Sequence, residues 1–466
     1  VIVPTLSFIA PVNAVAYNSA SPIFMDADDY YNIDSTKTIE FINKETVFKD
    51  GFTFNKRTNR KIKAIIPVHV FGNAILLDEL IPLCEERNIC VVKQKHEVDS
   101  STSINTIALL GPDYIGLKPT MLVKEGDTVL SGQKLFEDKK NPGIFITAPS
   151  SGIIKSINRG EKRRLLSLII ELDNTLDSIT FDSKNFSKSI DLLLESGTFS
   201  YFRTRPYNRI PEPNSIPAAI FVNACDTNPL SIDPYLIIQH EQELFDSGLK
   251  FIQSISPQSK SYCCYQNQSF KKSIKDVEYY QFNGPHPAGL SGTHIHFLYP
   301  VSQNRTVWTI SWQEVISIGY LLKHQKLRTN KIISLGGPSV FDPKIVEVNY
   351  GSNLSELTAG KIHDNSRIIS GSVLNGHEAT GVMNYLGAYD NQVSVIPDES
   401  NDILFNWAMP GASLHSKLPA FLSSWIKPKK YTFNVSMNGA NRSIVPIASY
   451  QEIMPLNILS TQLLKS

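Results

Sequence analysis

Between residues 104 and 172 the sequence repeats one pattern, in which short apolar segments are separated by single glycines. Glycine adopts positive φ without strain, so glycines at this spacing predict tight turns between short antiparallel strands. The segments VKEGDTVLSGQKLFE and TAPSSGIIKSI favour two similar hairpin layers that bury their Val, Leu and Ile side chains. The turn glycines are Gly126, Gly132, Gly143, Gly152 and Gly160. The pattern therefore predicts a small two-layer β domain.

A two-layer β domain of this kind resembles the barrel-sandwich of biotinyl and lipoyl carrier proteins. Carrier domains present their modified lysine on an exposed hairpin, flanked by methionines or by Asp and Ala. Lys139 and Lys140 lie near such a hairpin, but their local sequence is EDKKNPG. A solvated lysine pair beside a Pro-Gly turn is therefore favoured. A carrier that bears lipoyl or biotin on one of these lysines is kept as an alternative.

Charge and cysteine content narrow the possible partners of this 466-residue chain, whose length suggests about three domains. Its 45 basic and 44 acidic residues nearly cancel, which disfavours nucleic acid as a partner. The five cysteines form no CxxC pair, which fits a reducing compartment and offers no iron-sulfur ligand set. The most apolar segment, at residues 1–25, is interrupted by prolines and predicts no membrane span. We expect a cytoplasmic protein that reaches a membrane only by docking on membrane subunits.

Residues 1–92 follow a different pattern, with short apolar runs around the helix-like stretch LLDELIPLCEER. This order predicts βαβ units and a mostly parallel sheet. The segments VIVPTLSFIAPVNAVAYNSASPIFMDAD, YNIDSTK and IKAIIPVHVFGN resemble an internal slice of the DegT-type sugar aminotransferases, which use pyridoxal phosphate (PLP). The abrupt change near residue 93 predicts a join between two unrelated reading frames.

The aminotransferase resemblance implies a cofactor-stacking position at Phe8 and a strand at NICVV that continues into V-V-E-D-A. In that family the aspartate pairs with the pyridinium nitrogen, and the Schiff-base lysine comes later. Here the strand continues into VVKQKHEVDS. We therefore expect a truncated, catalytically inactive PLP-transferase fragment that is marginally packed, with open sheet edges. A fragmentary nucleotide-sugar aminotransferase is kept as an alternative function.

The stretch from Ser215 to Ile255 predicts a buried strand at residues 218–224, a polar turn and a helix. Asp233 is suited to cap this helix and Pro234 to occupy its first turn. Apolar residues then recur at helical spacing, which favours α/β structure with a parallel sheet. The turn residues Cys225, Asp226 and Asn228 are better explained by capping and turn formation than by catalysis.

Three histidines and three glycines crowd residues 283–297, NGPHPAGLSGTHIHF. Alternation in HIHFLYPV predicts a strand, and two histidines on one strand face suggest zinc. A complete zinc site needs further ligands, and neither a cysteine pair nor an H-x-x-x-H helix supplies them. A glycine-rich turn could instead hold phosphate or flavin through backbone N–H groups. The residues concerned are Gly284, His286, Gly289, Gly292, His294 and His296.

From about residue 93 to the end, many long segments resemble one family in order: TIALLGPDYIGLKPTMLVKEGD, FRTRPYNRIP, AIFVNACDTNPLSIDP, FNGPHPAGLSGTHIHFLYPVS, ISGSVLNGHEATG and VPIASYQEIMPLNIL. That family is the NqrA subunit of the sodium-translocating NADH:quinone reductase. The resemblance implies a multidomain α/β and α+β chain. The expected parts are the truncated segment 1–92, a barrel-sandwich at 93–175, a Rossmann-like domain at 176–330, a soluble-ligand-binding (SLBB) β-grasp module at 331–376 and returning strands at 377–466. The family's C-terminal extension is missing after TQLLKS.

The NqrA resemblance also implies function. It implies a peripheral subunit on the cytoplasmic side of the bacterial inner membrane that partners the membrane subunit NqrB and quinone, either ubiquinone or menaquinone. NADH, FAD, FMN, riboflavin and a 2Fe-2S centre would serve the whole complex, with no tightly bound cofactor, metal or catalytic residue on this chain. The glycine-rich stretch would be a relic nucleotide loop, now structural or docking, with its histidines hydrogen-bonded within the domain.

Two segments combine aromatic surface with donors for quinone carbonyls. FRTRPYNR offers Arg203, Arg205, Tyr207 and Arg209, and LGPDYIGLKP offers Tyr114, Gly116 and Lys118. The same residues suit docking on a membrane protein, because arginines also pair with carboxylates at interfaces. Both interpretations stay open on the sequence alone.

Overall fold

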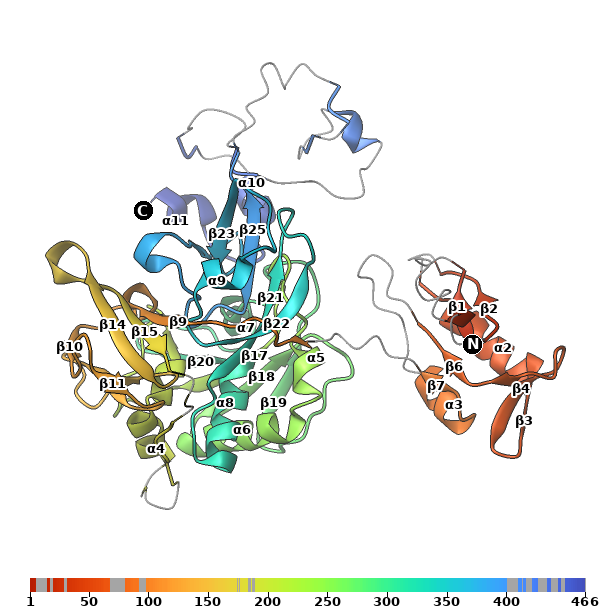
Figure 1. Ribbon diagram of the computed structural model, residues 1–466, viewed down its shortest axis with the longest axis horizontal. Helices are drawn as coiled ribbons and strands as arrows, with labels where there is room; N and C mark the ends of the chain where they lie inside the picture. Colours follow the sequence, from red (N-terminus) through yellow and green to blue (C-terminus); the bar gives the residue numbers. More distant parts are fainter. Residues whose placement is uncertain are drawn as a thin grey trace. The chain divides into compact units, whose positions relative to one another are not determined.

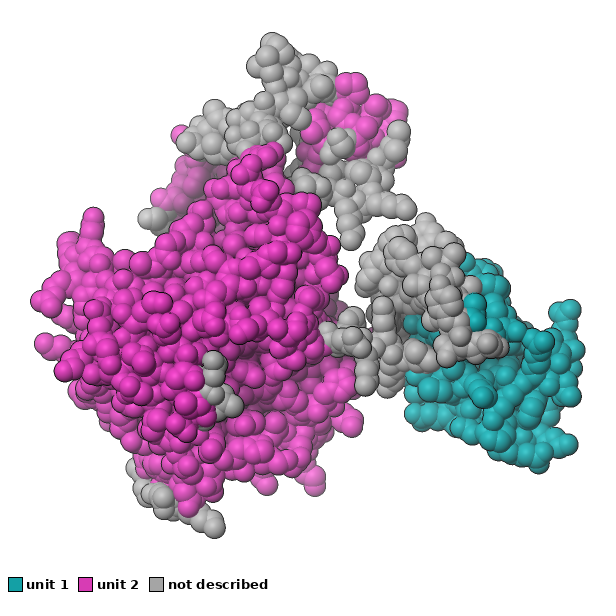
Figure 2. All heavy atoms as spheres, viewed as in Figure 1, with its two compact units in different colours: residues 1–97 teal, residues 98–466 magenta. Residues whose placement is uncertain are grey.

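The computed structural model divides the chain into two compact units, Val1–Glu97 and Val98–Ser466 (Figure 2). None of the helices it describes is long and apolar enough to cross a membrane. The described residues are 1–5, 15–16, 20–28, 32–67, 80–91, 98–173, 175, 177–182, 186, 189–399, 410–412, 414–415, 421–425, 434–436, 443–445 and 449–465.

The first unit carries a parallel sheet in the order β2-β1-β6-β7, as its sequence predicts. Its strands are β1 (Ile2–Pro4), β2 (Ile23–Met25), β6 (Ala64–Ile65) and β7 (Cys90–Val91). Helices α2 (Ser35–Glu45) and α3 (Leu80–Glu86) accompany it, with an antiparallel sheet of β3 (Thr46–Lys49), β4 (Phe52–Asn55) and β5 (Lys61–Ile62). The unit has a small core of its own that includes Ile2, Ile33, Ile65 and Leu80. Phe8 lies outside the described residues.

The second unit begins with the two-layer β domain (Figure 1), and its strand pairs are antiparallel as predicted. One layer holds β10 (Pro119–Met121), β12 (Lys134–Asp138) and β13 (Phe145–Thr147); the other holds β11 (Thr128–Val129), β14 (Gly152–Arg159), β15 (Leu165–Leu172) and β9 (Thr106–Leu110). Gly126 and Gly132 adopt positive φ, at 90° and 87°, as turn glycines should. Gly160 does not, with φ −96°; in that turn Lys162 and Arg163 take the left-handed conformation instead.

A five-stranded sheet in the order β16-β20-β17-β18-β19 forms the α/β domain, and the predicted parallel pairing is confirmed for β20, β17, β18 and β19. The strands are β16 (Arg203–Arg205), β17 (Ala219–Ala224), β18 (Lys260–Tyr265), β19 (Glu278–Gln281) and β20 (Val307–Ser311). The helices are α4 (Ser189–Ser196), α5 (Tyr235–Ile238), α6 (Gln242–Ile255), α7 (Ser291–Leu298) and α8 (Trp312–His324).

The predicted helix after Pro234 is in fact two helices, α5 and α6, which are separated by residues 239–241. Asp233 still contributes a hydrogen bond at the start of α5, because its Oδ1 accepts from the N–H of Tyr235 at 3.0 Å. The break places Leu236 and Leu244 on different helices, so one helical period cannot run through both.

The predicted strand over HIHFLYPV is wrong, since residues 291–298 form the helix α7. Consecutive Thr293, His294 and Ile295 are all buried, which a half-exposed strand would not allow. The His294 ring packs 4.2 Å from the Phe282 ring, and its Nε2 lies 2.8 Å from the Ala288 carbonyl oxygen. A short alternation of this kind does not outweigh such tertiary contacts.

The third part of this unit is a six-stranded sheet in the order β24-β23-β25-β21-β22-β8. Its strands are β21 (Asn330–Gly336), β22 (Lys344–Asn349), β23 (Ser366–Ser370), β24 (His377–Glu378), β25 (Gln392–Pro397) and β8 (Val98–Asp99). The same part holds a short helix, α9 (Leu354–Thr358), and Asn353 caps it by accepting from the N–H groups of Ser355 and Glu356.

One apolar core joins the three parts of the second unit, because its buried members come from the two-layer β domain, the α/β sheet and the third sheet alike. Helices α10 (Ser449–Ile453) and α11 (Ser460–Lys465) follow near the C-terminus. Beyond β25, much of the range 377–466, where returning strands were expected, falls outside the described residues.

Candidate functional site

The two segments singled out as donor-rich, at residues 110–119 and 202–209, pack against each other. The Arg203 Nη1 donates to the Asp113 carbonyl oxygen at 2.7 Å, and its guanidinium lies 4.1 Å from the centre of the Tyr389 ring. A Cβ built at Gly116 would lie 3.2 Å from Nε of Arg209. The structure therefore brings together residues that are about ninety positions apart in the sequence.

The arginine segment divides into a buried and an exposed half. Arg203 is buried, and Arg205 bonds to Asn208 of its own turn. Burial, and secondarily the nearby Arg203 charge, lowers the pKa of the Arg205 guanidinium to about 10. Tyr207 is 73% exposed, and the Arg209 guanidinium lies 5.9 Å from its ring centre. Only this exposed half can meet a ligand or partner directly.

The segment from Gly111 to Thr120 begins with the 3-10 turn η2 (Gly111–Asp113) and separates two cavities. Tyr114 is buried with its ring edge-on to Phe136, at 6.0 Å between ring centres. The backbone N–H of Lys118 donates to Asp138 at 2.9 Å, while the Lys118 side chain is exposed. The buried Tyr114 and the exposed Lys118 thus sit on a loop held at both ends.

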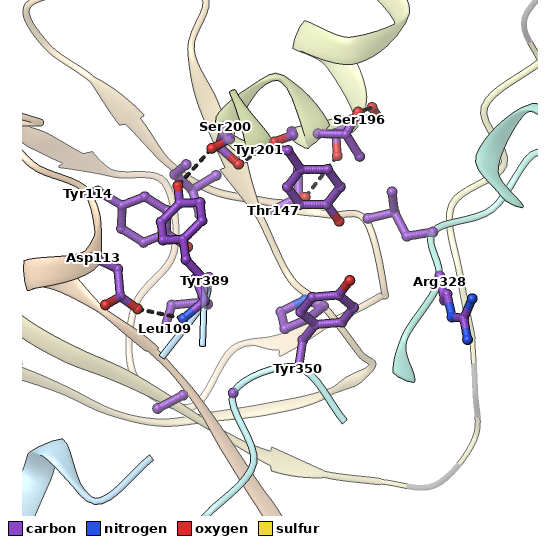
Figure 3. Close-up of a pocket in the computed structure, with 18 of the residues that line it drawn as sticks. Leu109, Asp113, Tyr114, Thr147, Ser196, Ser200, Tyr201, Arg328, Tyr350 and Tyr389 are labelled. Atoms are coloured by element: carbon purple, nitrogen blue, oxygen red, sulfur yellow. Dashed lines mark hydrogen bonds between the residues drawn. The ribbon is translucent and has the colours of Figure 1, made fainter. Parts of the chain in front are cut away.

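The inner cavity, of about 70 Å³, is surrounded by the rings of Tyr114, Tyr201, Tyr350 and Tyr389 (Figure 3). The Tyr389 hydroxyl donates to the Ser200 carbonyl at 2.7 Å. A space of this size holds a few water molecules at most. Pockets that bind small-molecule ligands have volumes of about 300 to 1,000 Å³. The inner cavity is therefore too small for a quinone ring.

Asp113 is the acidic residue of the inner cavity. Its Oδ2 accepts from the Ala388 N–H at 2.8 Å, and burial raises the pKa of this carboxyl to about 6. On the other side of the same residue, the Ala388 carbonyl accepts from the Lys331 ammonium at 2.9 Å, which lies 3.7 Å from a carboxylate oxygen of Glu314. Lys331 and Glu314 are both buried, so polar groups of all three parts of the unit meet here.

The outer pocket, of about 760 Å³, lies on the other side of Tyr114. Ile115, Leu117, Phe136 and Leu165 supply apolar walls. Its polar lining is cationic and comprises Lys118, Lys139, Arg159, Lys162, Arg163 and Arg164. Three of the predicted residues, Tyr114, Gly116 and Lys118, thus line a pocket of ligand size.

Sequence reasoning missed the arginine-rich side of this pocket. The run RGEKRR at residues 159–164 is a visible signal, because four cations gather in the turn between two predicted strands. Phe136 and Tyr389 carried no signal, since nothing in their local sequence separates them from other core aromatics. Lys139 lines the outer pocket, whereas the Lys140 ammonium donates to the Gly116 carbonyl at 3.0 Å.

The glycine- and histidine-rich stretch lies elsewhere, beside the ends of β17 and β20. Gly289 lines a separate polar cavity of about 170 Å³ together with Asn223 and Ser311. The His286 Nδ1 lies 3.3 Å from the Thr227 hydroxyl, and the His296 Nε2 is 3.4 Å from the Asn457 N–H. Gly292 belongs to α7, and Gly284 has φ 133°. Within the described part of the chain, no three His, Cys, Asp or Glu side chains gather as a metal-binding group.

Comparison with known proteins gives the family. Models of the NqrA N-terminal barrel-sandwich hybrid domain, the NqrA second alpha/beta domain and the NQRA C-terminal domain match residues 89–173, 187–327 and 332–381 in turn. The NqrA subunit of the Na⁺-translocating NADH-quinone reductase from Yersinia pseudotuberculosis serotype I is 44% identical over 378 residues, which make up 79% of this chain and 84% of that protein. The chain belongs to the NqrA family.

A second NqrA relative, from Neisseria meningitidis serogroup C, is 44% identical over 78% of this chain and 83% of its own length. The NqrA models account for three domains of the second unit: barrel-sandwich, α/β and SLBB. Residues 1–97 match a different model, that of the DegT/DnrJ/EryC1/StrS aminotransferase family. The two sequence resemblances are therefore confirmed. A solved NAD⁺-reducing [NiFe]-hydrogenase has a TM-score of 0.33 at 13% identity over 46% of this chain and 48% of its own, which is too low to bear on function.

Proposed function

We propose that this chain acts as the peripheral NqrA subunit of a Na⁺-translocating NADH:quinone reductase, a complex that couples quinone reduction to Na⁺ export. The relatives from Yersinia and Neisseria carry that name at 44% identity over most of their length. At the cytoplasmic face of the inner membrane, the chain docks on the membrane subunit NqrB. NADH, FAD, FMN, riboflavin and the 2Fe-2S centre belong to the other subunits, so electrons arrive from outside this chain.

The role of this chain at the quinone end rests on one observation, the outer pocket beside Tyr114 and Lys118. Its volume of about 760 Å³ suits a quinone head group, and its aliphatic and aromatic walls suit a flat, uncharged ring. The exposed Lys118 ammonium is a donor for a quinone carbonyl oxygen. Burial raises the pKa of the Tyr114 hydroxyl far above its usual value, so this side chain stays protonated.

The wall of the pocket fixes how these groups act. Phe136 holds the Tyr114 ring edge-on, and Asp138 holds the Lys118 backbone, so the two side chains keep their spacing when a ring enters. Because a reduced quinone carries more negative charge on its oxygens, the Lys118 ammonium stabilises the reduced form more than the oxidised one.

The test replaces Lys118 by Met in the assembled complex, with NADH-driven quinone reduction as the readout. Loss of one charged donor is expected to raise KM for quinone about tenfold, while NADH oxidation with an artificial acceptor stays unchanged. Lys124→Met, at another exposed lysine of the same domain, is the control. An unchanged KM in Lys118→Met would place the quinone elsewhere and leave docking on NqrB as the role of this loop.

We also propose the type and the boundaries of each domain from the resemblance to the NqrA and aminotransferase families. The α/β domain is Rossmann-like, and its glycine-rich stretch at residues 284–296, a loop that leads into α7, is a relic nucleotide site that is now structural. The domain boundaries are those predicted at residues 92, 175 and 330, whereas the last domain extends past the predicted residue 376, because β25 pairs with β21 and β23 in one sheet. Residues 1–92 are an inactive PLP-transferase fragment, and absence of a pyridoxal phosphate absorbance band on titration of the full chain would support this.

A further inference from the structure

Six cationic side chains surround the outer pocket, and none of them is balanced by an acid. Lys118, Lys139, Arg159, Lys162, Arg163 and Arg164 are all exposed. Among the described residues none of the six forms an ion pair, and no acidic residue lines the pocket. The nearest acids along the chain are Glu161, in the turn of Lys162 and Arg163, and Asp138, whose Oδ1 accepts from the backbone N–H groups of Lys118 and Lys140. An uncharged quinone ring gives no reason for so many unpaired cations, so they need another explanation.

Four of these cations are carried by the β14–β15 hairpin, which projects from the body of the second unit (Figure 1). The turn η3 (Glu161–Arg163) holds them in a fixed arrangement, since Lys162 and Arg163 have positive φ and the Arg159 guanidinium bonds to the Arg163 carbonyl at 3.1 Å. A rigid projecting turn with four long cations presents its charge to a flat surface at little cost in entropy.

Apolar side chains stand exposed on the neighbouring loops. Ile115, in the pocket lining, is 44% exposed, and Tyr207 is 73% exposed. The two loops touch through Gly116 and Arg209. Exposed aliphatic and aromatic groups beside lysines and arginines are the combination found at the interface between water and lipid, where rings enter the head-group layer and cations meet phosphate.

We propose that this face of the domain, the hairpin cations together with Ile115 and Tyr207, binds the anionic head groups of a phospholipid bilayer. Charge complementarity favours phosphate-bearing lipid, and the exposed apolar pair favours a bilayer over a purely acidic polypeptide. The inference deepens the proposed quinone role, because quinone is dissolved in lipid and a pocket opened at the bilayer surface would meet it there. The hairpin cations and the exposure of Ile115 and Tyr207 are observed independently of any role in quinone binding.

The experiment uses the full chain and sedimentation with vesicles, with no quinone and no other protein of the complex present. Vesicles contain either pure phosphatidylcholine or 30% phosphatidylglycerol, a composition chosen for the test. The variant is Arg159→Gln/Lys162→Gln/Arg163→Gln/Arg164→Gln. The control is Lys250→Gln/Lys271→Gln/Lys275→Gln/Lys326→Gln, which removes four exposed lysines and so gives the same net charge.

The wild type and the control are expected to bind the anionic vesicles, with at least tenfold weaker binding at about 500 mM salt than at about 50 mM. The hairpin variant is expected to bind at least tenfold less than both at low salt. Equal loss in variant and control, or equal binding to neutral vesicles, would overturn the proposal. Tighter binding to a poly-glutamate peptide than to the vesicles would assign the surface to an acidic polypeptide instead. Loss of vesicle binding in about 10 mM inorganic phosphate at constant ionic strength would assign it to free phosphate.

Discussion

At the scale of single residues, the least expected group is the buried carboxyl of Asp113. Its surroundings contain four tyrosines and one close N–H donor, from Ala388. One such bond does not offset the loss of water around a charge, which is why burial dominates and raises the pKa of this carboxyl to about 6. No local sequence feature predicts this, because the groups that contact Asp113 come from residues 203 and 388.

Replacing Asp113 by Asn should flatten the dependence of stability on pH. An unfolded aspartate has a pKa of about 3.9, so between about pH 4 and pH 6 the folded wild type binds more protons than the unfolded chain. The contribution of Asp113 to the free energy of unfolding therefore falls as pH rises through this window, by about 2 to 3 kcal/mol, and is level above it. Asn keeps an acceptor for the Ala388 N–H.

Urea unfolding at pH 4.5, 5.5 and 7 measures this difference. Asp113→Asn should gain stability relative to wild type as pH rises, whereas Asp342→Asn, at an exposed position, should follow the wild type. Parallel pH curves for wild type and Asp113→Asn would show that the carboxyl is not held neutral.

At the scale of elements, helices α6 and α8 cross through two glycines. A Cβ built at Gly248 would lie 2.1 Å from the Val315 carbonyl oxygen, and one at Gly319 would lie 1.9 Å from that of Leu244. Each glycine faces the backbone of the other helix, which cannot move aside as a flexible side chain could. Close contact between the helices therefore depends on the absence of both methyl groups.

Gly319→Ala should destabilise the second unit by roughly 1 to 3 kcal/mol, as overpacking does, despite the better helix propensity of alanine. Gly292→Ala in α7 is the matched control, since nothing lies within 4 Å of its built Cβ, and it should be neutral or stabilising by up to about 1 kcal/mol. Thermal unfolding of both variants gives the comparison; equal effects would refute a role for the close crossing.

Elements were predictable where the local pattern was long or had a clear boundary residue. The strand β17 and the role of Asp233 at the start of α5 follow directly from sequence. The helix α7 did not, because His294 is placed by contacts with Ala288 and Phe282. In the candidate site, Tyr114, Gly116 and Lys118 were found from donor types on a glycine-bounded loop. The hairpin cations beside them required the fold, which sets residue 118 near residues 159–164.

At the scale of the whole molecule, the chain holds two units with separate cores. The smaller core draws on residues 2 to 89, and the larger starts at Ile104. The smaller unit has short strands of two to four residues and leaves β2 and β7 as sheet edges within its described residues. Among its described residues the core cluster has eight buried members, which is small for independent stability.

Calorimetry of the full chain should therefore show two transitions, with the smaller unit unfolding at the lower temperature. A chain shortened to residues 98–466 should keep the upper transition within about 2 °C and lose the lower one. The measured enthalpies identify the units, since the larger has almost four times as many residues. A single transition that moves on truncation would mean that the two cores unfold together.

The first strand of the barrel-sandwich is completed by residues made much later. Ala108 N–H donates to the Gly351 carbonyl at 2.8 Å, and Thr106 donates to Glu356, 250 positions further on, at 2.7 Å. At about 5 to 20 residues per second, a ribosome needs roughly 10 to 50 s to synthesise that interval. During translation the outer edge of β9 thus waits uncovered, and an uncovered strand edge can pair with other chains. During that time the nascent barrel-sandwich is a substrate for chaperones. This holds however stable the domain becomes after the last domain has covered β9.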